Sequence, residues 1–122
     1  MIKRNIVHIE IPSKHTRQSS EFYEKLFGWH IVHDKDMDYT MWEPHEGPGG
    51  GFSVVGEDTQ VGEVLLFVNS EDIDTDLETA VSLGATIIKK KSEIPGIGWF
   101  GVFKDPTGNA LALYTSLNPQ AN

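Results

Sequence analysis

Two stretches decide the fold, Ile6-Val-His-Ile-Glu-Ile-Pro12 and Glu21-Phe-Tyr-Glu-Lys-Leu-Phe-Gly-Trp29. The first stretch is rich in β-branched residues and ends at a proline, which is typical of a strand. We therefore expect a strand over about residues 2–11. Because successive side chains on a strand alternate in direction, His8 and Glu10 point to one face. The opposite face is purely apolar and carries Val7, Ile9 and Ile11.

The second stretch has the pattern of an amphipathic helix. Its large apolar side chains fall on one helical stripe, made of Phe22, Tyr23, Leu26 and Phe27. Ser13 or Thr16 can cap the start of this helix, and Gly28 is a natural stop after Phe27. A strand followed directly by a helix is thus the first unit of the predicted fold.

Further strands are expected after this helix. The polar turn at 36–38 separates two of them, and the glycine-rich segment 44–51 is expected to be a loop, acting as a flexible lid or containing a bulge. Because segment 44–51 precedes a strand and not a helix, it lacks the helix N-terminus that a phosphate site uses. The predicted strands of this half are 29–35, 39–43 and 52–55, and the polar segment 57–62 forms the internal boundary.

The second half repeats this order. An apolar run at 64–68 precedes a helix that Ser70 or Asp72 can begin and Gly84 can end. That helix has apolar residues at Ile73, Leu77, Ala80 and Val81. Strands are expected at 85–89, 99–103 and 110–116, with a loop at 92–98 and a turn at 105–109. The chain therefore reads β-α-β-β-β twice, as a repeat of element order and not of individual residues.

Length and composition limit the possible functions. The 122 residues fit a single domain, and the net charge of −8 disfavours binding to nucleic acid or to an anionic membrane surface. The absence of cysteine excludes disulfides, thiolate metal sites and thiol catalysis. The sequence has no apolar run long enough for a membrane span and no apolar signal segment, so we expect a cytoplasmic protein.

At this level of detail the chain resembles the vicinal oxygen chelate superfamily, which includes glyoxalase I, extradiol dioxygenases and bleomycin-binding proteins. The resemblance implies an α+β fold of two βαβββ modules that form a cupped mixed sheet, often in a dimer. We expect one domain over 1–122, with module one at 1–57, module two at 62–117 and a tail at 118–122. Besides the two opening stretches, the matching segments are Gly47-Pro-Gly-Gly-Gly51, Glu71-Asp-Ile-Asp74, Leu83-Gly-Ala85, Pro95-Gly-Ile-Gly-Trp-Phe100 and Lys104-Asp-Pro-Thr-Gly-Asn109.

The resemblance also implies where a divalent metal would bind. His8 matches the histidine ligand on the first strand, but Leu65 or a neighbour stands where the second histidine belongs. Ala112 stands where a glutamate ligand is usual. A catalytic divalent site needs about three protein ligands. We therefore expect no cofactor and no metal in the family site, with an atypical metal site as the alternative.

The candidate site residues combine a polar pair with large side chains. His8 and Glu10 share a strand face and are the candidates for catalysis or for ligand binding. Aromatic walls with a few polar groups suit a small organic ligand. Each residue also has a structural interpretation, as a hydrogen-bonded histidine or as core or dimer packing. The predicted ligand pocket contains His8, Glu10, Tyr39, Met41, Trp42, Trp99 and Phe100.

Two functions are compatible with these residues. The first is a small-molecule-binding protein with a degenerate metal site, for which an acidic surface favours a cationic ligand. The second is a lyase, isomerase or dioxygenase-like enzyme that uses His8 and Glu10 with an atypical metal or none. In both cases we expect a homodimer with a small-molecule ligand and no nucleic-acid or membrane partner.

Overall fold

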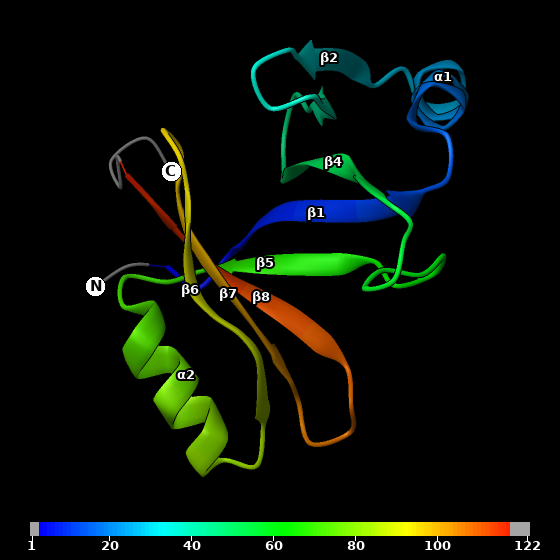
Figure 1. Ribbon diagram of the computed structural model, residues 1–122. Coiled ribbons are helices and arrows are strands. Elements are labelled where there is room, and N and C mark those ends of the chain that lie inside the picture. The colour runs from blue at the N-terminus through cyan, green and yellow to red at the C-terminus, as the bar shows by residue number, and fades with distance from the viewer. Residues whose placement is uncertain (1–2, 118–122) are drawn as a thin grey trace. The chain divides into compact units, whose positions relative to one another are not determined.

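The computed structural model describes residues 3–117, which hold eight strands and two helices (Figure 1). The strands and helices follow one another as β-α-β-β-β twice, which confirms the predicted element order and the α+β class. The expected tail at 118–122 and the start of the predicted first strand at Ile2 lie outside the described residues. Within residues 3–117, neither helix has the length and apolar character needed to cross a bilayer.

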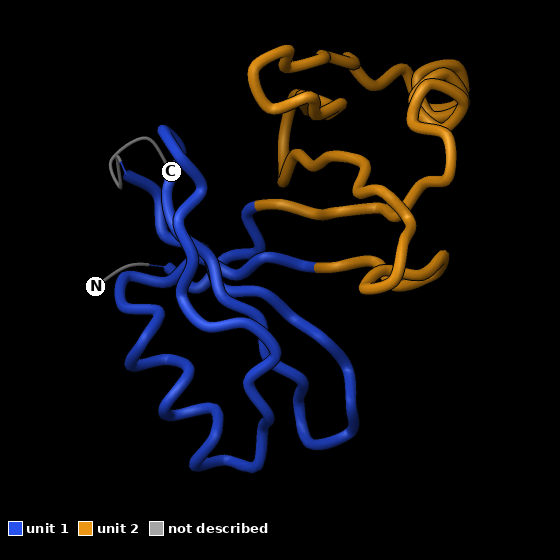
Figure 2. Tube along the Cα trace, in the orientation of Figure 1, with its two compact units in different colours: residues 1–7, 66–122 blue, residues 8–65 orange. Residues whose placement is uncertain are grey.

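The chain divides into two compact units, residues 8–65 and residues 1–7 with 66–122 (Figure 2). Each unit is built around one βαβββ module. The N-terminal module consists of β1 (Ile6–Ser13), α1 (Thr16–Phe27), β2 (His30–Asp34), β3 (Tyr39–Glu43) and β4 (Gly49–Val54). The C-terminal module consists of β5 (Leu65–Asn69), α2 (Ile73–Ser82), β6 (Thr86–Ile94), β7 (Gly98–Lys104) and β8 (Ala110–Ser116).

In the N-terminal module the strands lie in the order β2-β3-β4-β1. The β2·β3 and β3·β4 pairs are antiparallel, whereas β4 and β1 run parallel. Glu10 on β1 is paired with Gly51 on β4, and Gly51 is paired in turn with Met41 on β3. This register aligns Glu10, Gly51 and Met41 in one row across three strands, so that their side-chain positions lie on the same face of the sheet.

The C-terminal module has the same topology, with strands in the order β5-β8-β7-β6. Its helix α2 packs on one face of these strands (Figure 1). Ile73 and Leu77 of α2 form a buried cluster with Leu113 of β8. The partly buried residues packed against this cluster are Ile87, Trp99 and Phe103.

The glycine-rich loop predicted at 44–51 is wrong in its second part, because β4 begins at Gly49. A Cβ on Gly50 would overlap the backbone oxygen of Ile9 and the ring of Trp42. A Cβ on Gly51 would overlap the phenol of Tyr39. These glycines therefore serve close packing within a strand, whereas their composition alone favours a turn.

The loop predicted at 92–98 is also partly wrong. Strand β6 extends to Ile94, and its register with β7 contains two irregularities, between Ile87 and Lys89 and between Lys89 and Ser92. The lysine run 89–91 lies inside β6. In the strand order of this module β6 is terminal, where charged side chains oppose edge pairing.

The helix starts differ between the modules. The N-cap residue of α1 is His15, which makes no side-chain cap hydrogen bond, so the caps predicted at Ser13 or Thr16 are wrong. The Ser13 hydroxyl is instead 2.6 Å from the Ser19 hydroxyl. Asp72 caps α2 as predicted and accepts a 3.1 Å hydrogen bond from the Thr75 N–H. Gly28 ends α1 in the left-handed conformation, with φ of 73°.

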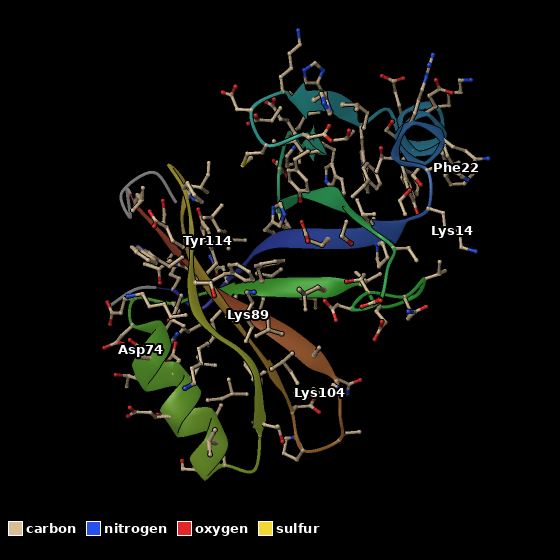
Figure 3. All side chains as sticks on the ribbon, viewed as in Figure 1. Lys14, Phe22, Asp74, Lys89, Lys104 and Tyr114 are labelled. Carbon is tan, nitrogen blue, oxygen red and sulfur yellow. The ribbon has the colours of Figure 1, made fainter. Side chains whose placement is uncertain are left out.

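The apolar stripe predicted on α1 is only partly buried. Tyr23 stacks on Trp29 and Phe52, with ring centroids 5.3 and 5.9 Å apart. In contrast, Phe22, Leu26 and Phe27 are 57%, 59% and 58% exposed (Phe22 is labelled in Figure 3). Helix α1 thus presents apolar surface to the outside of the N-terminal module.

Candidate functional site

His8, Glu10 and Tyr39 meet on one face of the N-terminal module. The His8 Nε2 atom is 2.8 Å from the Tyr39 hydroxyl oxygen. The Tyr39 hydroxyl donates a short hydrogen bond to Glu10 Oε2, which is itself 3.5 Å from His8 Nε2. The side chains of His8 and Glu10 are 30% and 23% exposed, so the group is partly buried and still accessible. We call these three residues the polar triad.

Gly51 makes this meeting possible. His8 and Glu10 lie on β1, whereas Tyr39 lies on β3, and β4 runs between these two strands. The Tyr39 phenol crosses β4 where Gly51 leaves the strand without a side chain, because a Cβ there would overlap the phenol oxygen. Any other residue at position 51 would therefore push Tyr39 away from β1.

The hydrogen bonds of the polar triad have a direction. A phenol carries one proton, so a hydroxyl that donates to Glu10 leaves its oxygen as the acceptor for His8. His8 Nε2 must then carry a hydrogen. Burial raises the pKa of Tyr39 far above its usual range, and the charge of Glu10 and its hydrogen bond add to the effect. Tyr39 therefore stays a neutral donor at ordinary pH.

The face of this module that packs against α1 is aromatic. Trp42 is 4% exposed and stacks on Trp29, with ring centroids 4.4 Å apart. It also contacts Phe52, at a centroid distance of 5.5 Å. The sequence predicts Trp42 in the pocket, but the structure places it in this core. Trp42 follows Met41 on β3, so its side chain lies on the opposite face of the strand.

The other predicted site residues are divided between the modules. Met41 is half-buried and shares a strand face with Tyr39, since the two lie two positions apart on β3. Trp99 packs with the α2 core of the C-terminal module, and Lys91 Nζ lies 4.9 Å from its ring centroid. Phe100 points the other way and lies 6.4 Å from the ring of Phe67. The structure thus brings together His8, Glu10 and Tyr39 of the predicted set.

The metal positions that the family resemblance points to can be tested by the donors they hold. Ala112 is completely buried, is paired with Phe67 and has no donor atom in its side chain. Leu65 is equally without a donor side chain. Across residues 3–117, no three His, Asp or Glu side chains converge in a way that could hold a metal ion. Neither Leu65 nor Ala112 therefore carries a side chain that could bind a metal ion.

The family model of the glyoxalase-like domain matches residues 8–114, which cover both modules and the polar triad. The chain belongs to the glyoxalase-like domain family. This assignment bears out the resemblance drawn from the sequence stretches. No curated protein sequence matches this glyoxalase-like chain.

Solved structures with the glyoxalase-like fold carry varied names. Methylmalonyl-CoA epimerase from Mycobacterium tuberculosis aligns with a TM-score of 0.72 at 14% identity, covering 96% of this chain and 91% of that chain. A glyoxalase/bleomycin resistance protein/dioxygenase superfamily member from Vibrio splendidus 12B01 aligns with a TM-score of 0.65 at 15% identity, covering 93% and 100%.

A third structure, named NAD-dependent benzaldehyde dehydrogenase from Legionella pneumophila, aligns with a TM-score of 0.67 at 17% identity, covering 89% and 97%. Identities this low show the shared fold alone. Because one fold hosts several activities, the function of this chain has to be argued from its own site.

The strand pattern pairs His8 with Glu10 but does not connect either residue to Tyr39. It favours Tyr39 in the pocket for its aromatic ring, whereas the Tyr39 hydroxyl makes the important contacts. The missing signal is Gly51, whose purpose is visible only from the pairing of three strands. The run of three glycines at 49–51 could have indicated a strand without side chains, over which a neighbouring side chain can pack.

Proposed function

We propose that this glyoxalase-like protein binds a small organic molecule at the polar triad and that its metal site is degenerate. One observation carries the proposal. Three polar side chains meet, partly accessible, on the module face opposite to the aromatic core. Polar groups that are removed from water need hydrogen-bond partners. Partial burial of the Glu10 carboxylate costs desolvation free energy, so its position is not explained by stability of the fold. A binding role accounts for the arrangement.

The donor set supports the metal part of this proposal. Of the positions that hold ligands in the metal enzymes of the superfamily, only His8 carries a side chain able to bind a metal. Leu65 and Ala112 supply none, and the nearby Glu10 is already engaged with Tyr39. We therefore derive no step through a metal ion.

A thermal-shift screen of metabolites and antibiotics tests the binding proposal. A ligand present at 100 times its dissociation constant adds about 2.7 kcal/mol to the stability of the folded protein. The shift should vanish in His8→Ala, whose own melting temperature stays close to that of the wild type. His30→Ala is the matched control, because His30 is an exposed histidine of the same module. Loss of the shift in both variants, or unfolding of His8→Ala without any ligand effect, contradicts the proposal.

The relay of hydrogen bonds favours a second function, a lyase or isomerase that moves a proton without metal. Connected hydrogen bonds from His8 through Tyr39 link two proton donors to the carboxylate of Glu10, which can accept a proton. Incubation of a bound compound in D2O would reveal exchange of a carbon-bound proton by NMR. Exchange that disappears in Glu10→Gln would favour the enzyme over the binding protein.

We also propose that the protein forms a homodimer. The support is the apolar surface of α1, where Phe22, Leu26 and Phe27 are more than half exposed. Large exposed apolar patches are uncommon on monomers and are typical of interfaces. Light scattering should give about twice the chain mass of 13.6 kDa, and Phe22→Glu should shift the species toward the monomer. The expected cytoplasmic location stays a prediction.

A further inference from the structure

The polar triad has an uneven balance of donors and acceptors. The only hydrogen of the Tyr39 hydroxyl goes to Glu10, and the His8 Nε2 hydrogen goes to the Tyr39 oxygen. Both donations run toward the carboxylate of Glu10. An ionised carboxylate accepts about four hydrogen bonds through its two oxygens, so this group can take more donors than the triad supplies.

The charge of the triad is uneven in the same sense. The side chains in contact with Glu10 are Tyr39, which is neutral, and His8, which is charged only when protonated. No lysine or arginine forms an ion pair with Glu10 among residues 3–117. The unit formed by residues 8–65 contains four Lys and Arg against eleven Asp and Glu, which gives −7 of the chain's net charge of −8. The unit that holds the triad therefore carries nearly all of the chain's net negative charge, which favours the approach of cations over anions.

The accessibility of Glu10 allows a ligand to use this imbalance. Its side chain is 23% exposed, which leaves room for contact while the surrounding protein lowers the local dielectric. Hydrogen bonds that involve an ionised partner are about twice as strong as neutral ones. A cationic donor would gain most from such a carboxylate, whereas an anion would meet repulsion.

From this geometry we infer that the ligand of the polar triad is an organic cation with N–H donors, such as an ammonium or amidinium group on an apolar body, and that Glu10 binds the cationic group. This inference rests on the proposed function, because it names the ligand class of the same site. Met41, on the same strand face as Tyr39, offers an apolar contact for the body of the ligand.

Three probes of one size test the inference: benzamidine, benzyl alcohol and benzoate, which are cationic, neutral and anionic at neutral pH. Their affinities are measured by NMR titration, following the backbone amides of residues 8–10 and 49–51. Benzamidine should bind at least about tenfold more tightly than the other two probes. Its affinity should fall as salt is added, since added ions screen the charge of Glu10.

Two variants assign the effect to one carboxylate. Glu10→Gln should remove the preference for benzamidine, whereas Glu43→Gln should leave it within about twofold. Glu43 is the matched control, because it is an exposed glutamate at the end of β3 in the same module. If Glu10→Gln fails to fold, the ranking of the three probes and its salt dependence in the wild type still decide the question.

Each outcome separates the inference from the proposed function. Benzoate or benzyl alcohol binding as tightly as benzamidine at these amides would overturn the cation and leave a binding site at the triad. A preference for benzamidine that survives Glu10→Gln, or that Glu43→Gln also removes, would overturn the role of Glu10. The proposed function itself fails only by the ligand screen and the His8→Ala comparison.

Discussion

The two modules place different chemistry on corresponding strand positions. In the N-terminal module Glu10 is paired with Gly51, and Tyr39 lies two residues before Met41, the other partner of Gly51. In the C-terminal module Phe67 is paired with Ala112, and Phe100 lies two residues before Val102, the other partner of Ala112. Glu10 thus corresponds to Phe67, Tyr39 to Phe100 and Gly51 to Ala112.

The contact itself is kept while its chemistry changes. Tyr39 and Glu10 share a hydrogen bond, and at the corresponding positions Phe100 and Phe67 share a ring contact at 6.4 Å. Backbone pairing sets which side chains meet, because ladder hydrogen bonds do not depend on the side chains that the strands carry. One topology can therefore hold a polar site in one module and an apolar cluster in the other.

The helices differ in a similar way. Ser13 and Ser19, whose hydroxyls are in contact at the start of α1, lie six positions apart, as do Ser70 and Asp76, which are hydrogen-bonded at the start of α2. Asp76 also receives two hydrogen bonds from Arg4, at 2.6 and 2.9 Å. The C-terminal module thus has a charged anchor where the N-terminal module has a neutral one.

The largest expected effect distinguishes the two helices. Leu77 of α2 is 3% exposed in the core, whereas Leu26 of α1 is more than half exposed. Leu77→Ala should lower the free energy of unfolding by about 3 kcal/mol through lost burial and a cavity. Leu26→Ala should change it by less than about 0.5 kcal/mol. Urea denaturation measures both, and equal losses would show that α1 is covered in solution.

Placing a tyrosine at position 100 of the C-terminal module, which corresponds to Tyr39, should destabilise the protein. Phe100→Tyr would place a hydroxyl where Ala112 has its Cβ, since a Cβ at the corresponding Gly51 overlaps the Tyr39 oxygen. We expect a loss of about 2 kcal/mol from overpacking and an unpartnered hydroxyl. Adding Ala112→Gly should recover part of it. A double variant no more stable than Phe100→Tyr would contradict the correspondence of the two positions.

Alkaline pH should lower the stability of the folded protein through Tyr39 of the polar triad. Because the pKa of Tyr39 is raised from its ordinary value of 10.0, the folded state holds the phenol proton more tightly than the unfolded state. Stability present below that value is lost as the pH rises above it, by about 1 kcal/mol per pH unit. Tyr39→Phe should remove this component.

The absorbance of phenolate checks the same titration directly. While the protein is folded, wild type and Tyr39→Phe should show the same phenolate absorbance as the pH passes about 10, the ordinary pKa of a tyrosine, because Tyr39 stays neutral. An additional phenolate in the wild type, with the fold retained, would mean that Tyr39 is not held by Glu10 as described.

The smallest expected effect concerns Asp76. Hydrogen bonds from Arg4, then from Ser70, hold the pKa of Asp76 below its ordinary value of 3.8. The stability that this gives is present above that value and is lost as the pH falls through the lower, folded-state pKa. Because Arg4 is more than half exposed, we expect about 1 kcal/mol or less. The free energy of unfolding, measured by denaturation between neutral and acidic pH, should fall less steeply for Asp76→Asn than for the wild type. Asp74→Asn, at an exposed position of the same helix, is the control and should behave like the wild type.

Much of the fold could be predicted from local pattern. The order of strands and helices, the stop at Gly28 and the cap at Asp72 follow from alternation, helical spacing and turn chemistry, which act between residues close in sequence. The pairing of His8 with Glu10 on one face follows from the same alternation. The helix stripe around Tyr23 could be predicted only in part, because burial depends on what packs above the helix.

The sequence by itself determined a twice-repeated βαβββ order, an acidic chain without cysteine, and positions 65 and 112 without metal-binding side chains. Only the tertiary structure decided that Gly51 belongs to a strand, that Trp42 lies in the core, and that Tyr39 joins His8 and Glu10. The physical reason is sequence distance. Tyr39 is 31 residues from His8 and 29 from Glu10, and strand register, which brings them together, is fixed by long-range pairing that no local pattern specifies.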